Sequence, residues 1–249
     1  MSNVNLFNGC KFTVESNNEE FHTFDDWNLY IVNTDCIGNP EQYTNYVEVP
    51  GRDGRLDMSE ALTGRPVYLG RKLKIQLSSA RPKTMWDATV SYFRNHINGR
   101  VCKITFDNDM SYFWRGRVHI DDFESVMTKG SFTVNVDAEP YKYSIHQSTE
   151  PWLWNPFNFQ TDVITYQGAW TVSGTLTVTI PKGNMPTSPT FVVSDLVGNN
   201  ISMTCNGKTY SLVSGSNKFL DVLVNGDSEV ELLFSGSAKV QIVYRGGSL

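Results

Sequence analysis

Several sequence features that mark common enzymes are missing from this chain of 249 residues. The glycine-rich stretch from 49 to 68 has no GxGxxG pattern, and Arg65 and Pro66 follow Gly64 where a P-loop needs Lys and then Ser or Thr. HExxH and GxSxG sequences are also absent. We therefore expect no nucleotide or other cofactor, no catalytic metal motif and no enzymatic activity.

Cysteine is scarce, and its spacing excludes the usual metal sites. Cys10, Cys36, Cys102 and Cys205 form no CxxC pair. We expect reduced, mostly buried thiols in preference to a disulfide framework. The sequence has no basic start followed by an apolar core, and no apolar run of membrane-spanning length. It predicts a protein that is made in the cytoplasm, is not secreted and does not contact a membrane.

An excess of positive charge is absent as well. The first 145 residues contain 16 basic and 19 acidic residues, and the remainder contains 5 basic and 7 acidic residues. Neither part has the basic surface that is typical of nucleic-acid binding. The mixed charges of the first part favour polar contacts with other proteins or other copies.

The patterns that are present predict mainly β structure. Apolar alternation predicts strands over 101–106, 111–120 and 131–138, the first two joined as a hairpin by a turn. One helix is expected over 82–97, because Trp86, Val90, Phe93 and Ile97 share a helical face.

A polar, proline-containing segment from 139 to 157 indicates a linker, which divides the chain into domains 1–145 and 146–249. Asn206-Gly207 predicts a two-residue hairpin loop that sets Cys205 opposite Lys208. The second domain reads as a β-sandwich, with strands expected over 175–180, 190–194, 201–205, 208–212, 219–224, 229–234 and 239–244.

Candidate catalytic groups are weak. Asp107 and Asp109 lack the glycine and distal Glu of an EF-hand, so a turn is the better interpretation. The acidic pairs at 25–26 and 121–122 read as solvated surface. The four histidines occur in no catalytic motif, although a dispersed triad is recognised only by geometry.

An aromatic cluster follows the linker. It could form a sugar-stacking platform, but aromatic residues beside a linker more often pack between domains. The cluster comprises Trp152, Trp154, Phe157 and Phe159.

The stretch "VEVPGRDGRLDMSEALTGRPVYLGRKLKIQL" (47–77) closely resembles the core motif of phage distal tail proteins, the Dit family of long, non-contractile-tailed phages. The resemblance covers nearly the whole chain and is most specific from 46 to 143. It is weaker in the second half, where many β-sandwiches would match. The matching positions are Gly51, Arg52, Asp53, Gly54, Leu56, Asp57, Glu60, Gly64, Arg71, Lys72 and Leu73.

The resemblance implies a structural virion protein at the distal end of the tail. It implies a six-fold ring that joins the tail tube to the tail-tip hub (tail-associated) protein, with a channel through which genome DNA only passes. The first domain would form the ring, and the second would be a galectin-like sandwich that carries receptor-binding proteins in many family members. The alternative function is a carbohydrate-binding sandwich that contacts the host cell wall.

The glycine-rich stretch is then expected at or near a subunit interface. Arg52, Arg55 and Arg65 can pair with carboxylates of the next copy, or they can brace a long loop within one subunit. The carboxylates available are Asp53, Asp57 and Glu60. Residues 19–46 are expected to form an arm that wraps a neighbour.

Overall fold

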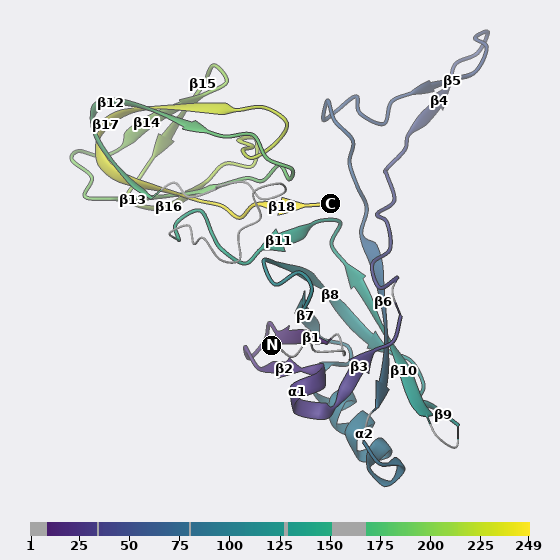
Figure 1. The fold of residues 1–249 in the computed structure, drawn as a ribbon. Coiled ribbons are helices and arrows are strands. Elements are labelled where there is room, and N and C mark those ends of the chain that lie inside the picture. The colour runs from purple at the N-terminus through teal and green to yellow at the C-terminus, as the bar shows by residue number, and fades with distance from the viewer. Residues whose placement is uncertain (1–8, 34, 80, 127–128, 151–167) are drawn as a thin grey trace, which may run out of the picture. The chain divides into compact units, whose positions relative to one another are not determined.

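The computed structural model describes residues 9–33, 35–79, 81–126, 129–150 and 168–249. These residues fall into two compact units. Unit 1 extends to Asp109 and adds Phe113–Pro140, and unit 2 comprises Met110–Tyr112 and Tyr141–Leu249. Both units are mainly β, as the sequence predicts (Figure 1).

A curled antiparallel sheet forms most of unit 1. Its first and last strands are joined only by the short helix α1 (Thr23–Trp27), so the sheet must curl until its two ends approach each other. A further strand, β9 (Glu124–Val126), pairs with the start of β10. The strand order is β2 (Glu20–His22), β1 (Cys10–Val14), β7 (Val101–Phe106), β8 (Tyr112–Ile120), β10 (Lys129–Ala138), β6 (Arg71–Ser79) and β3 (Leu29–Ile31).

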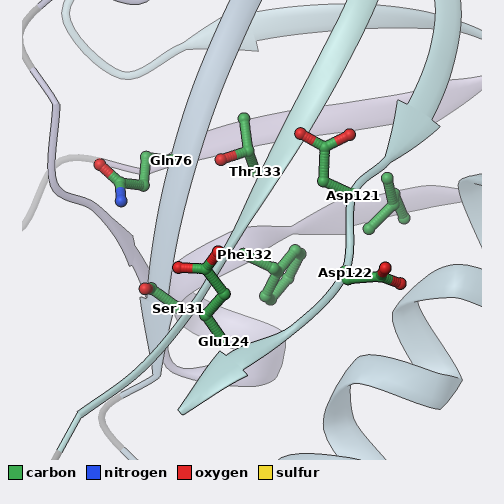
Figure 2. A pocket seen from close by; sticks show the side chains of 8 residues that line it. Gln76, Asp121, Asp122, Glu124, Ser131, Phe132 and Thr133 are labelled. Atoms are coloured by element: carbon green, nitrogen blue, oxygen red, sulfur yellow. The ribbon is translucent and has the colours of Figure 1, made fainter. Parts of the chain in front are cut away.

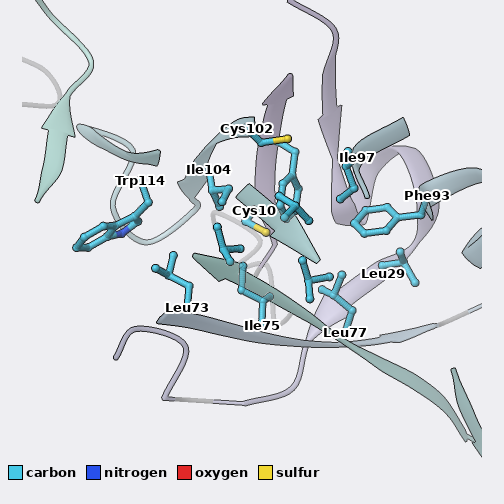
Figure 3. Close-up of a cluster of buried hydrophobic side chains, with 14 of the residues drawn as sticks. Cys10, Leu29, Leu73, Ile75, Leu77, Phe93, Ile97, Cys102, Ile104 and Trp114 are labelled. Carbon is cyan, nitrogen blue, oxygen red and sulfur yellow. The ribbon is translucent and has the colours of Figure 1, made fainter. Parts of the chain in front are cut away.

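The core of unit 1 lies between this sheet and helix α2 (Trp86–Ile97) (Figure 3). Strand β6 alternates buried and exposed residues, as a strand with one face on a core must. From the helix, the ring of Phe93 packs edge-to-face against Phe12 and Trp27, with ring centres 5.8 and 4.5 Å apart.

The predicted hairpin of 101–106 and 111–120 is confirmed, since β7 pairs with β8. The predicted helix starts later than expected. Residues Lys83–Met85 form a 3-10 turn, η1, and the α-helix begins at Trp86. Neither start has a side-chain cap, which explains why the first turn is tighter than an α-helix.

The structure corrects the expectation of an arm that begins at residue 19. Residues 20–31 form β2, α1 and β3, and the side chains of Trp27 and Leu29 lie in the core of unit 1. Elements of three to five residues are too short to show a period in the sequence. The segment that extends from the unit comes later in the chain and is described below.

Unit 2 is built around one long strand pair. Strand β12 (Ala169–Ile180) pairs with β17 (Val230–Val243) along its whole length. On its other side, the first half of β17 pairs with β14 (Ile201–Cys205) and the second half with β13 (Thr190–Ser194). The outer strands are β15 (Lys208–Leu212) on β14 and β16 (Gly215–Lys218) on β13.

The two halves of β17 bury the same face. Val230, Leu232 and Phe234 point into the core from the first half, and Val240 and Ile242 do so from the second. These strands form one sheet, and the pair β12–β17 curls around the buried face from one layer to the other (Figure 1). This is the β-sandwich that the sequence predicts.

The Asn206-Gly207 hairpin is confirmed in its register, with Cys205 opposite Lys208 and Ile201 opposite Leu212. Two strand predictions are corrected. Residues 219–224 are not a strand, and their only ladder contact is the isolated bridge from Thr187 to Val224. The predicted strands 229–234 and 239–244 are one continuous strand, β17.

A pair of glycines explains why one strand can serve both layers. Gly174 of β12 lies opposite Gly236 of β17, and both have positive φ angles, 87° and 140°. L-residues with a side chain rarely adopt this conformation, so glycine allows both strands to bend at the same point.

We predict that Gly174→Ala lowers the free energy of unfolding by roughly 1–2 kcal/mol, because alanine must adopt a left-handed conformation there. A Cβ at this position meets nothing within 4 Å, so the effect is one of backbone strain alone. Urea unfolding measures it. The control is Gly226→Ala, whose Cβ would make an ordinary 3.6 Å contact with Pro186. Equal stability of the two variants would contradict the strained bend.

Candidate functional site

The glycine-rich stretch lies in an extended two-stranded segment, residues 41–69, which we call the arm. At its base, the backbone N–H of Tyr43 donates to the carbonyl of Val67, and that of Leu69 donates to Glu41, each at 2.8 Å. Farther out, β4 (Tyr46–Glu48) pairs with β5 (Arg55–Asp57) (Figure 1). No residue of the arm is buried.

The turns of the arm depend on glycine. Gly51, Gly54 and Gly64 have φ angles of 81°, 78° and 67°, and a Cβ at any of them would meet nothing within 4 Å. The backbone conformation therefore requires glycine here, whereas crowding does not. Gly51 and Gly54 lie in the tip turn between β4 and β5.

A short chain of hydrogen bonds fixes the base of the β4–β5 hairpin. One carboxylate oxygen of Asp57 accepts from the backbone N–H of Ser59 at 2.9 Å and from its hydroxyl at 2.5 Å. The same hydroxyl oxygen accepts from the backbone N–H of Asn45 at 2.8 Å, across the hairpin. These donors favour the charged carboxylate and lower the pKa of Asp57.

The other charged residues of the motif form no ion pair within the chain. This holds for Arg52, Arg55 and Arg65 throughout the part of the chain that the structure describes. The guanidinium of Arg55 instead lies 5.2 Å from the ring centre of Tyr46. Among the described residues, bracing within one subunit thus has no ion pair to support it, and the subunit interface stays a prediction.

Large apolar side chains are exposed along the same arm, and Leu62 is 100% exposed. Sequence reasoning missed them because it weighed the charges. The available signal was the number of aliphatic and aromatic residues flanking the glycine turns. Exposed apolar patches are typical of surfaces that contact a protein, a membrane or a ligand. The residues are Tyr43, Tyr46, Val47, Val49, Met58, Leu62 and Leu69.

The structure separates one predicted site residue from the rest. Arg71 is the first residue of β6, beyond the base of the arm, and its side chain is buried on the core face of the sheet. Lys72 and Leu73 of the motif follow it in β6, and the motif residues from Gly51 to Gly64 lie in the arm, as does Arg65. The predicted site is therefore an exposed surface with a buried arginine near its base.

The aromatic cluster Trp152, Trp154, Phe157 and Phe159 lies outside the described residues. The sugar platform and the packing seam both stay predictions.

An acidic groove lies over the sheet of unit 1 (Figure 2). Asp121, Asp122 and Glu124 line a cavity of about 540 Å³ together with Phe132. Asp122 is exposed and lies 3.7 Å from Arg94, as expected for solvated surface. Among the residues that the structure describes, no group of three His, Cys, Asp or Glu side chains is placed to hold a metal ion.

The four cysteines are free thiols. Burial raises the pKa of all four, to about 11 for Cys102, so they remain protonated near neutral pH. In the described part of the chain, no helix is long and apolar enough to cross a membrane.

We predict that Ser59→Ala raises the pKa of Asp57 towards its ordinary value, because the carboxylate loses a hydroxyl donor. The carboxyl pKa is measured by an NMR titration. Ser214→Ala, in unit 2, is the control and leaves it unchanged. An Asp57 pKa that is the same in wild type and Ser59→Ala would show that the hydrogen bonds at the hairpin base do not form in solution.

Comparisons with known proteins show which fold this structure resembles. No family model matches the chain, and no curated protein matches it in sequence. The structure is similar to the crystal structure of the SPP1 Dit (gp 19.1) protein, described as a paradigm of the hub adsorption apparatus in phages that infect Gram-positive bacteria. The TM-score is 0.60 at 11% identity, over 96% of this chain and 98% of that chain. The resemblance seen in the sequence is thus confirmed in the fold, and the chain has the fold of a phage Dit protein.

Proposed function

We propose that this chain is a structural protein of a phage tail, where it forms a hub ring at the distal end. The observation that carries the proposal is the Dit fold, which extends over nearly the whole chain. The partners are then the tail tube protein on one side and the tail-tip hub protein on the other. The protein would be made in the host bacterial cytoplasm, reside in the virion and have no catalytic role.

The arm gives the ring its subunit contact. An isolated two-stranded hairpin is marginally stable in water, and this one exposes apolar residues on a segment without any buried residue. Packing against a second copy would cover that surface. Because the arm of one copy would meet a different surface of the next, the contact would be head-to-tail, the type that forms a ring when the rotation between copies closes. The resemblance implies six copies.

The charge of the chain suits a channel. A net charge of −5 leaves no excess of basic residues to hold the phosphates of DNA, so the genome passes through without being retained. We assign ring formation to residues 1–145. We assign the attachment of receptor-binding proteins to the sandwich of 146–249, with the galectin-like role that the resemblance implies.

Immunogold electron microscopy of virions from the phage that encodes this chain tests the function. Label at the distal end of the tail supports it. Label elsewhere on the virion, or virions without the protein, would overturn it.

We predict that the double variant Val47→Asp/Leu62→Asp loses self-association while keeping its stability to within about 0.5 kcal/mol, because both side chains are exposed. Light scattering over a concentration series measures the mass, which falls towards one subunit, 28.1 kDa. If the wild-type ring needs the tail tube as a template, the amount of each variant in purified tails gives the same comparison.

The matched control for the arm variant is Val197→Asp, which introduces the same charge at a site in unit 2 that is 71% exposed. It keeps the wild-type mass and tail content. An arm variant that assembles as well as this control would show that the arm is not the subunit contact.

A further inference from the structure

Arg71 occupies a buried position of β6, where the alternation of the strand predicts an apolar residue. In β6 the buried positions alternate, so Arg71 shares its face with Leu73, Ile75 and Leu77. Only 6% of its surface is exposed, and Ala138 of the next strand lies opposite it. Arginine is rarely buried to this extent unless it is paired.

Among the described residues, no carboxylate forms an ion pair with this arginine. Its guanidinium lies 4.6 Å from the ring centre of Trp114. The Nε and Nη2 atoms are buried and have no hydrogen-bond partner among the described residues. A buried, unpaired charge is costly, and burial accordingly lowers the pKa of Arg71.

Another arginine of unit 1 shows what pairing looks like in this fold. Arg115 donates to both carboxylate oxygens of Glu15, at 2.7 and 2.9 Å, and also to Glu139. Two carboxylates thus surround a guanidinium that is more exposed than that of Arg71. The contrast shows that the described residues leave Arg71 without the carboxylate partners that Arg115 has.

We propose that Arg71 binds a carboxylate on the arm of a second copy of this chain. The inference rests on the proposed ring, whose head-to-tail contact brings the arm of one copy to the base of the arm of the next. The guanidinium lies on Trp114 before assembly and binds the carboxylate as the subunits join. Its donors then gain a partner that the described residues of one chain do not provide.

The surroundings of Arg71 favour a second copy over other sources of an anion. Leu69, two residues away, and Ile37, bridged to Leu73, are 46% and 44% exposed, and a protein surface would cover both. A phosphate of DNA would leave them exposed to water. The arm itself carries Asp53 and Glu60, which form no ion pair within the described chain. These two are the carboxylates we assign.

The first test is the stability of the dilute, dissociated chain. Arg71→Met replaces the guanidinium with an apolar side chain, and we expect a midpoint of thermal unfolding equal to or higher than that of wild type. The control Arg115→Met removes a paired arginine and lowers the midpoint. A midpoint of Arg71→Met below that of wild type would show that Arg71 only stabilises the single chain, which overturns the proposal.

The second test is assembly, measured as the copies of each variant in purified tails. Arg71→Met weakens the subunit contact at least about thirtyfold, the lower end of the range for losing one partner of a buried charge pair. Asp53→Asn or Glu60→Gln weakens it similarly, and combining that variant with Arg71→Met causes no further loss. Lys218→Met, in unit 2, is the neutral control.

Two assembly results would overturn the proposal. One is normal assembly of Arg71→Met, and the other is a loss that adds to that of both carboxylate variants. Loss of DNA binding by purified Arg71→Met, with normal assembly, would assign the site to phosphate. Wild-type chain absent from tails would instead refute the proposed function, while the unfolding result would still report on the unpaired charge.

Discussion

The constraint on which unit 1 depends is the short connection between the two ends of its sheet. Helix α1 has five residues and links β2 to β3, strands at opposite ends of the order. Its C-terminal cap, Asn28, takes a left-handed conformation that ends the helix at once. The sheet must therefore stay curled around Phe93 and its neighbours. Strand β6 belongs to that curled sheet. Strand β3 pairs with the C-terminal end of β6, and the arm leads into the other end of β6.

Much of this fold could be predicted from local patterns, because a two-residue turn or a helical face involves residues close in the sequence. The Asn206-Gly207 hairpin and the face of α2 are examples. The unpredicted parts depend on distant residues. The continuous strand β17 requires Gly174 and Gly236 to face each other, and residues 219–224 have a strand-like pattern without a strand to pair with. The sequence predicts an arm over 19–46, whereas the arm of the structure is 41–69. The polar turns of 41–69 resemble an ordinary loop, so the sequence alone does not show that this segment extends from the unit.

The candidate site shows the same division. The glycines and charges of the motif could be found from the sequence, and the glycines do form the turns. Which charges lack a partner could not be found, because ion pairs such as Arg115 with Glu15 join residues 100 positions apart. In the arm, hydrogen bonds of Asp57 and Ser59 order the base of the β4–β5 hairpin, and the surrounding surface is charged and apolar. A preformed base lowers the conformational entropy lost on association.

The main segment of unit 2, Tyr141–Leu249, has its first and last strands paired with each other. Strand β11 (Lys142–Ser144) pairs with β18 (Gly247–Ser248). Beside them, the backbone N–H of Ser148 donates to the carbonyl of Tyr244, and the N–H of Tyr244 donates to the Ser148 hydroxyl. The strands that pair here flank the sandwich, whose own sheet contains β12 to β17. A domain whose entry and exit lie together can be replaced without moving the chain that flanks it. Recombination that exchanges this unit as a whole would therefore leave the sheet of unit 1 and its arm unchanged.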